Sequence, residues 1–268
     1  MSAAAGAVGR GVPLEAALRA RRDAGAKLLV TYMTAGLTED WVDYLQVMVE
    51  AGADAVEVGL PFSDPVMDGP TIQEASVRAL ARGVTPEAAL SALAVREQPV
   101  PLVAMTYYNL VLRAGLERFA ARAAAAGVTG AIIPDIPLEE SGPWEDAAAD
   151  AGVATVLLAA PVTSDERLAV LCRRSRGFVY GVNLMGVTGE RSSLAGSAGV
   201  LAKRLKAVTD LPVVMGFGIS TPQQAVEAAA AADGVVVASA LMRAVLDGAS
   251  VVELGAAVAD IRRALDRG

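Results

Sequence analysis

The chain has 268 residues, of which 54% are apolar, 20% are charged and 4% are aromatic. This length allows a large core, and the apolar content excludes an intrinsically disordered chain. Thirty acidic residues against 23 basic ones give a net charge of −7. Such a surface repels a phosphate backbone, so we expect no nucleic-acid partner.

The chain contains no histidine and one cysteine. The lack of histidine excludes Ser-His-Asp and Cys-His catalysis and the usual zinc sites, so we expect no metal and look to carboxylates for acid–base chemistry. Cys172 has apolar neighbours at helical spacing and is interpreted as a packing residue rather than a nucleophile. With neither a secretory pattern nor a long apolar run, we expect a cytoplasmic protein that does not enter a membrane.

A helix is predicted first, over residues 14–23, and short apolar runs then alternate with Ala-rich stretches. The runs predicted as strands are 28–32, 55–58, 102–106, 130–133, 155–159, 178–182, 213–215 and 235–237. The further stretches predicted as helices are 39–50, 73–81, 116–125, 140–149, 165–173, 200–207, 222–231 and 251–265. Uniformly apolar strands are typical of a parallel sheet that helices cover.

Glycines that follow predicted helices support these boundaries. Gly52, Gly127 and Gly152 each follow a predicted helix, where a left-handed cap is favoured. Eight strand–helix units predict an α/β fold with one domain over residues 1–268, a single (β/α)₈ TIM barrel with an extra N-terminal helix. Long loops are expected after the second strand, 59–70, and after the sixth, 183–198. A doubly wound sheet is the alternative, although it usually has a Gly-rich first turn that is missing here.

Glu57 is the first candidate catalytic residue. In the run AVEVG, Val56 and Val58 fit the side that faces the helices, which points Glu57 into the mouth of the barrel. A buried carboxylate is costly without a partner or a task, so we interpret Glu57 as a general acid/base with a raised pKa. A solvated glutamate at the edge, or an internal ion pair, is the alternative.

Asp64 and Asp68 lie in the loop that follows, PFSDPVMDGPTIQ. Each is next to proline or glycine, where aspartate often only forms a turn. Paired with Glu57, one of the two would supply a second carboxylate in the same cavity, and two carboxylates in different surroundings can act as acid and base.

Three further places lie after later strands. Tyr180 alternates with the outward Val179 and is either a core aromatic or part of the pocket, and the GVTG run at 186–189 lies in the next loop. The segment 216–218, Gly-Phe-Gly, follows the seventh strand, and Ala238 and Ser239 open a helix after the eighth. Barrels often bind phosphate at these two positions through backbone N–H groups.

These residues make the chain resemble the tryptophan synthase α-subunit family. The most specific stretch is AGADAVEVGLPFSDPVMDGPTIQ at 51–73, and five shorter motifs follow in the order of the family. They are MTYYN at 105–109, PDIPLEES at 134–141, GVTG at 186–189, GFGIS at 216–220 and ASALM at 238–242.

The resemblance implies a carbon–carbon lyase of tryptophan biosynthesis that splits indole-3-glycerol phosphate into indole and glyceraldehyde 3-phosphate. It implies Glu57 as the acid/base and Asp68 as the carboxylate beside the indole N–H, with Thr188 bonding Asp68 when its loop closes. The substrate-binding positions it implies are Tyr180, Thr188, Gly189, Gly216, Phe217, Gly218, Ala238 and Ser239.

The chain departs from the family pattern at two positions. Many members carry arginine where this chain has Leu184, so we expect an anchor of the loop to be missing or replaced. Ala238 replaces a usual glycine, and its methyl group is expected to crowd the phosphate and weaken its binding modestly.

The resemblance also implies a partner. Pro61, Phe62 and Asp64 belong to a loop that contacts the β subunit in the family, so we expect an α₂β₂ tetramer. No cofactor is expected in this chain, because pyridoxal phosphate would belong to the β partner. The alternatives are a stand-alone lyase that releases indole for another pathway, a different phosphate-binding barrel enzyme, and a non-catalytic regulatory subunit.

Overall fold

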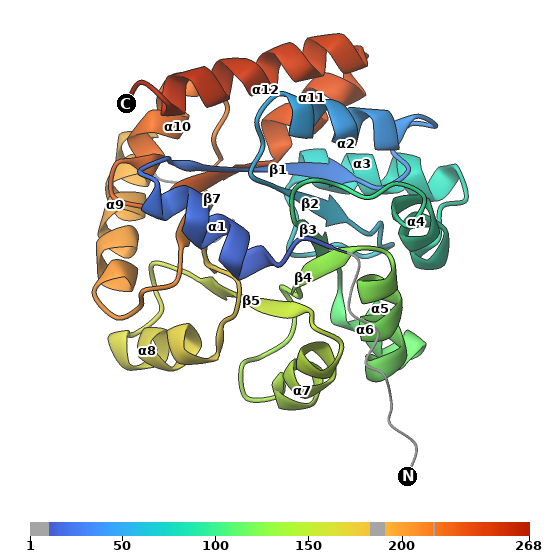
Figure 1. Ribbon diagram of the computed structural model, residues 1–268, viewed down its shortest axis with the longest axis horizontal. Coiled ribbons are helices and arrows are strands. Elements are labelled where there is room, and N and C mark those ends of the chain that lie inside the picture. Colours follow the sequence, from blue (N-terminus) through green and yellow to red (C-terminus); the bar gives the residue numbers. More distant parts are fainter. Residues whose placement is uncertain (1–10, 183–190, 217) are drawn as a thin grey trace.

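Eight parallel strands form a closed barrel in the computed structural model, and helices surround them (Figure 1). Each strand pairs with the next along the chain, and β1 pairs with β8 to close the ring. The structure describes residues 11–182, 191–216 and 218–268, and in the helix that begins at Arg191 it describes side chains from Ser197 onward. The predicted TIM barrel is confirmed.

All eight predicted strands are present, with ends within two residues of the predicted ones. They are β1 (Leu28–Thr34), β2 (Ala55–Gly59), β3 (Leu102–Met105), β4 (Val128–Ile132), β5 (Ala154–Ala159), β6 (Val179–Val182), β7 (Val213–Gly216) and β8 (Gly234–Val237). Every residue of β1, β2, β4 and β8 is buried, as expected for strands that lie between the barrel interior and the helices.

The helices confirm the predicted alternation and add to it. They are α1 (Leu14–Asp23), α2 (Trp41–Glu50), α3 (Pro70–Ala81), α4 (Pro86–Leu93), α5 (Tyr108–Ala114), α6 (Leu116–Ala125), α7 (Gly142–Asp150), α8 (Asp165–Arg174), α9 (Arg191–Lys206), α10 (Pro222–Ala229), α11 (Ser239–Leu246) and α12 (Val251–Leu265). The predicted caps are present, since Gly52, Gly127 and Gly152 have φ angles of 103°, 83° and 73°. Cys172 is buried in α8, as expected of a packing residue.

Two parts of the helix assignment from sequence were wrong. The short helices α4 and α5 were missed, because each is an additional helix within one strand-to-strand connection. Helix α9 begins at Arg191, so the loop after β6 is shorter than the predicted 183–198. The first residues of α9 include Ser192, Ser193 and Gly196, whose low helix propensity hid its start.

Helix α1 closes one end of the barrel. Leu14 and Leu18 are buried and belong to the same apolar cluster as Leu28 and Val30 inside the barrel. In Figure 1 the helix lies across the barrel in front of the strands. The opposite end, where the strands have their carboxyl termini, is therefore the end at which a site can open.

A buried ion-pair cluster fastens the closed end. The carboxylate of Asp54 accepts from Arg21 Nε of α1 at 2.7 Å, from the Leu29 backbone N–H at 2.8 Å and from Arg262 Nη1 of α12 at 3.1 Å. The Asp54 carboxylate thus connects α1, β1 and α12. Within the described part of the chain, no helix is long and apolar enough to span a bilayer.

Candidate active site

Glu57 lies inside the open end of the barrel. Its neighbours Val56 and Val58 pack among the helices, so alternation along β2 turns Glu57 inward. The residue is 1% exposed, and its Oε2 has no hydrogen-bond partner among the described residues. Burial, with a smaller contribution from the charge of Asp68, raises the pKa of Glu57 to about 8. This carboxyl is therefore protonated at neutral pH, and neither a solvated glutamate nor an ion pair fits it.

Asp68 is the second carboxyl in this pocket, and it lies in the loop between β2 and α3. Its Oδ2 accepts a hydrogen bond of 3.0 Å from the hydroxyl of Tyr107. Burial raises its pKa to about 6, while the bond from Tyr107 acts in the opposite direction. Asp68 is therefore mostly ionised at neutral pH, whereas Glu57 is mostly protonated.

The other candidate aspartate does not share this environment. Asp64 is exposed, and its Oδ2 accepts from the hydroxyl of its neighbour Ser63 at 2.5 Å. Of the two aspartates in the loop, Asp68 alone influences the pKa of Glu57. Asp64 therefore fits the turn-forming role, and Asp68 is the one that joins Glu57.

Tyr107 holds in place the loop between β2 and α3, residues 60–69, which we call the Asp68 loop. Besides donating to Asp68, its hydroxyl accepts from the Met67 backbone N–H at 3.0 Å. Its ring stacks on Phe62 with centroids 4.9 Å apart. Sequence reasoning did not assign Tyr107 a role, although its place just after β3, at the open end of the barrel, was a usable signal.

Tyr32 is a second tyrosine of the site that sequence reasoning missed. It pairs with Glu57 in the register of β1 and β2 and is 4% exposed. Burial raises its pKa well above the usual value, and the charge of Asp68 raises it further. Gly59 makes room for it, because a Cβ there would lie 1.8 Å from the Tyr32 hydroxyl oxygen. The inward alternation of residues 28, 30 and 32 was the available signal.

Tyr180 faces the same pocket from β6. Its neighbour Val179 packs in the outer cluster between barrel and helices, whereas Tyr180 packs inside the barrel. Burial raises the pKa of its hydroxyl well above the usual value, and the charge of Glu57 raises it further. Gly216 on β7 leaves space for the ring, since a Cβ there would lie 2.6 Å from Tyr180 Cε2. Tyr180 therefore lies inside the barrel near Glu57, and its contact with a substrate stays a prediction.

The ends of β7 and β8 lie at the same open end. Gly218 has a φ angle of 68°, which favours glycine, and α11 begins at Ser239 directly after Ala238. The first N–H groups of α11 receive no side-chain cap from Ala238, so they remain able to bind an anion. Thr188, Gly189, Phe217 and the divergent Leu184 lie outside the described residues.

Comparison with known proteins identifies the family. The sequence model of the tryptophan synthase alpha chain matches residues 18–261. The tryptophan synthase alpha chain of Thermobifida fusca is 45% identical and covers 85% of this chain and 86% of that protein. That of Gloeobacter violaceus is 44% identical and covers 92% and 90%. The chain belongs to the tryptophan synthase alpha chain family.

Solved structures of tryptophan synthases have the same fold. A Mycobacterium tuberculosis tryptophan synthase structure in space group F222 gives a TM-score of 0.87 at 38% identity, covering 96% of this chain and 100% of that one. The tryptophan synthase subunit alpha of Legionella pneumophila str. Paris gives 0.87 at 30% identity, covering 98% and 100%. As a member of the alpha chain family, the chain is a lyase of tryptophan biosynthesis that cleaves indole-3-glycerol phosphate.

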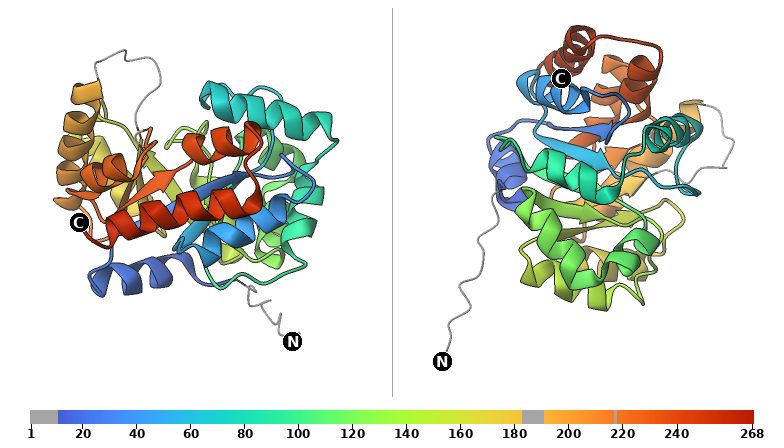
Figure 2. Two further views of the ribbon diagram at one scale, coloured as in Figure 1. Left: turned by 90° about the horizontal axis from the view of Figure 1, so that it is seen from above. Right: turned by 90° about the vertical axis from the view of Figure 1, so that its right-hand side faces the viewer.

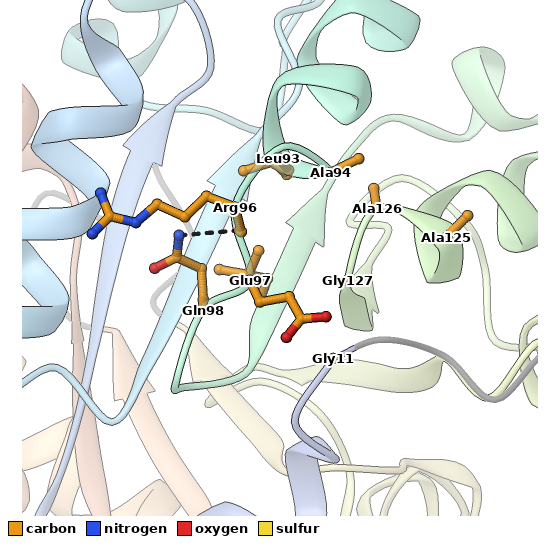
Figure 3. Close-up of a pocket in the computed structure, with 10 residues that line it drawn as sticks. Gly11, Leu93, Ala94, Arg96, Glu97, Gln98, Ala125, Ala126 and Gly127 are labelled. Atoms are coloured by element: carbon orange, nitrogen blue, oxygen red, sulfur yellow. Dashed lines mark hydrogen bonds between the residues drawn. The ribbon is translucent and has the colours of Figure 1, made fainter.

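Two hollows elsewhere on the barrel do not compete with this alpha-chain site. One, of about 10 Å³, lies between the end of α4 and the Ala125–Gly127 turn (Figure 3), where Gln98 Nε2 donates to Arg96 O at 3.4 Å. Its volume suits no more than a water molecule. The other lies beside α1 at the closed end, where Arg19 and Arg174 are already paired with Glu15 and Glu145.

Proposed function

We propose that Glu57 and Asp68 divide the acid–base work of splitting indole-3-glycerol phosphate into indole and glyceraldehyde 3-phosphate. The observation that carries this assignment is that the two neighbouring carboxyls differ in protonation state at neutral pH. Glu57, with a pKa of about 8, holds a proton at neutral pH, whereas Asp68, with a pKa of about 6, has lost one. Two carboxyls tuned apart in this way are suited to act as acid and as anion.

The reaction then proceeds in two proton transfers. Glu57 donates its proton to C3 of the indole ring, which places positive charge on the ring nitrogen. The carboxylate of Asp68 accepts a hydrogen bond from that nitrogen and stabilises the charge. Glu57, now ionised, removes the proton of the hydroxyl on the carbon attached to C3. The carbon–carbon bond breaks, its electrons restore the indole ring, the hydroxyl carbon becomes the aldehyde, and Glu57 is again protonated.

Tyr180 and the anion-binding ends of β7 and β8 complete the proposed site. Tyr180 lies beside the carboxyl pair and is suited to pack against the indole ring. The phosphate is assigned to the N–H groups of residues 216–218 and of the start of α11, with Ala238 and Ser239 at its edge. We expect Thr188 and Gly189 to complete the site from the loop after β6.

The methyl group of Ala238 gives a direct test of the phosphate assignment. Ala238→Gly is expected to lower the KM for indole-3-glycerol phosphate modestly, because the methyl group no longer crowds the anion. Gly142→Ala, at a position with no atom within 4 Å of the added Cβ, serves as the control for a change between these two residue types. An unchanged KM in Ala238→Gly would remove the crowding argument.

We propose further that the Asp68 loop docks a β subunit in an α₂β₂ tetramer, with pyridoxal phosphate in that partner and none in this chain. Pro61, Phe62 and Asp64 are the expected contacts. Val66 and Met67 in the same loop are 79% and 44% exposed, and such apolar exposure favours an interface. Asp64→Ala is expected to weaken activation by the β subunit more than substrate binding by the free chain. We expect the complex to be cytoplasmic.

The deciding experiment is indole release from indole-3-glycerol phosphate by the purified chain, with and without a tryptophan synthase β subunit. Weak release that rises many-fold with β supports the proposal, and strong release unaffected by β points instead to a stand-alone lyase. Glu57→Gln and Asp68→Asn are each expected to lower kcat on the order of 100- to 10,000-fold. Full activity in either variant would overturn the assignment of that residue.

A further inference from the structure

Helices α3 and α11 carry the two ends of the proposed substrate site. Helix α3 begins at Pro70, two residues after Asp68, and α11 begins at Ser239, where the phosphate is assigned. The two helices pack against each other on the outside of the barrel, and the left view of Figure 2 shows the orange-red helix α11 beside the teal helices. Their relative position therefore bears on the distance between the proposed phosphate position and Asp68.

Contacts made by charged side chains join these helices at two places along α11, near its middle and at its last residue. Arg243 Nη2 on α11 donates to Glu74 Oε2 on α3 at 2.9 Å, and it lies 3.4 Å from the hydroxyl oxygen of Thr71. Arg78 Nη1 on α3 donates to the backbone oxygen of Leu246, at the last turn of α11, at 3.1 Å. Contacts one turn from the start of α11 and at its end resist both sliding and tilting of one helix against the other.

Glu74 is the residue that links the contacts at these two places. Its Oε1 accepts from Arg78 Nη2 at 2.7 Å, while its Oε2 accepts from Arg243. The two arginines lower its pKa, Arg243 contributing more, so Glu74 is ionised wherever the enzyme works. A single carboxylate thus holds both arginines in the orientation that reaches across the helix pair.

We propose that Glu74, through Arg243 and Arg78, is a positioning residue that fixes the spacing between the phosphate-binding end of α11 and the Asp68 loop. The inference rests on the proposed function, because it needs the phosphate at α11 and the indole beside Asp68. A substrate that bridges two subsites binds and reacts well only when their spacing matches its length. A ligand that occupies one subsite alone is insensitive to that spacing.

The different sensitivity of a bridging substrate and of a ligand in one subsite supplies the test. Glu74→Gln keeps the side-chain length and removes the charge, and Arg243→Met removes the other partner of the pair. Each is compared with wild type in kcat and KM for indole-3-glycerol phosphate, and in the inhibition constants of indole and of glyceraldehyde 3-phosphate. Glu87→Gln breaks a similarly exposed ion pair, with Arg122 at 3.1 Å between α4 and α6, and is the matched control.

We expect Glu74→Gln and Arg243→Met each to lower kcat/KM about fivefold, since the contacts are half-exposed and moderate in strength. The double variant should fall little further than the worse single variant, because both substitutions remove the contact between Glu74 and Arg243. Arg243→Lys, which keeps the charge, should recover most of the loss. The inhibition constants of the two fragments and all constants of Glu87→Gln should equal those of wild type.

Two results would overturn the inference. Unchanged kcat/KM in both variants would show that the contacts do not set the spacing. Parallel weakening of substrate and of one fragment would show damage to a single subsite instead of a change in spacing. If wild type releases no indole from indole-3-glycerol phosphate, the proposed function fails and this inference fails with it. Unchanged kinetics in the variants alone would overturn only this inference and leave the proposed function intact.

Discussion

The hydroxyl of Tyr107 donates a 3.0 Å hydrogen bond to Oδ2 of Asp68, which connects the loop after β3 to the loop after β2. The same hydroxyl accepts from the Met67 backbone N–H, so the phenol is held on both sides. Burial alone would raise the pKa of Asp68 further, and this bond limits the rise. Tyr107 thus favours the ionised form of Asp68.

The first prediction concerns Tyr107→Phe, which keeps the ring stacked on Phe62 and removes the hydroxyl. The pKa of Asp68 should rise, because a donor to the charged form is lost, and the acid limb of the kcat/KM profile should move up by about one pH unit. At pH 7 the rate should fall about twofold, because about half of Asp68 would then be protonated, and it should recover at higher pH. An unmoved acid limb in a folded variant would show that Tyr107 does not tune Asp68.

A second prediction is a bell-shaped dependence of kcat/KM on pH for the wild-type chain. Below pH about 6 Asp68 gains a proton and can no longer stabilise positive charge, so activity falls. Above pH about 8 Glu57 loses the proton that it must donate, so activity falls again. Initial rates of indole release across pH 5 to 9.5 measure both limbs. A flat profile would contradict the division of roles.

The third prediction links Glu57 to stability. Its pKa is about 8 in the folded chain against the ordinary value of 4.5 for a glutamate, so between these values the folded state holds a proton that the unfolded chain has released. Rising pH then favours unfolding, and the contribution present at low pH is lost by about pH 8. Glu57→Gln has no ionisable group at this position, so it does not lose stability in this way as the pH rises. The free energy of unfolding of this variant relative to wild type should rise between pH 5 and pH 8, by about 3 kcal/mol.

Urea titrations at pH 5 and at pH 8 measure that difference. Asp68→Asn is the matched carboxyl-to-amide control and should show a smaller gain over a narrower range, because the folded pKa of Asp68 is only about 6. Equal stability of Glu57→Gln and wild type at both pH values would mean that Glu57 is not protonated in the folded enzyme.

The fourth prediction tests the fit between Gly59 and Tyr32. An added Cβ would lie 1.8 Å from the Tyr32 hydroxyl oxygen, so Gly59→Ala must displace the phenol beside Glu57. We expect a loss of about 1–3 kcal/mol in stability and about tenfold or more in kcat/KM. Gly142→Ala, which meets no atom within 4 Å, should match wild type in both. Wild-type activity in Gly59→Ala would show that Tyr32 can move without consequence.

Much of the architecture followed from sequence periodicity. Apolar strand runs alternating with helices predicted the eight-stranded barrel, because a strand covered on both faces has no polar side to show. The inward direction of Glu57 followed from the two-residue period of β2. Helices α4 and α5 were missed because each adds a helix to one connection without changing the order of the strands.

The sequence by itself determined the barrel, the inward carboxylate of Glu57 and the motifs of the family, because each depends on residues close together in the chain. The family resemblance already favoured Asp68 over Asp64, and only the tertiary structure brought Tyr107 and Tyr32 to the site. It also set the two carboxyl pKa values apart. The physical reason is that burial, a hydrogen bond between loops and the charge of Asp68 near Glu57 arise only when the strands close into a barrel.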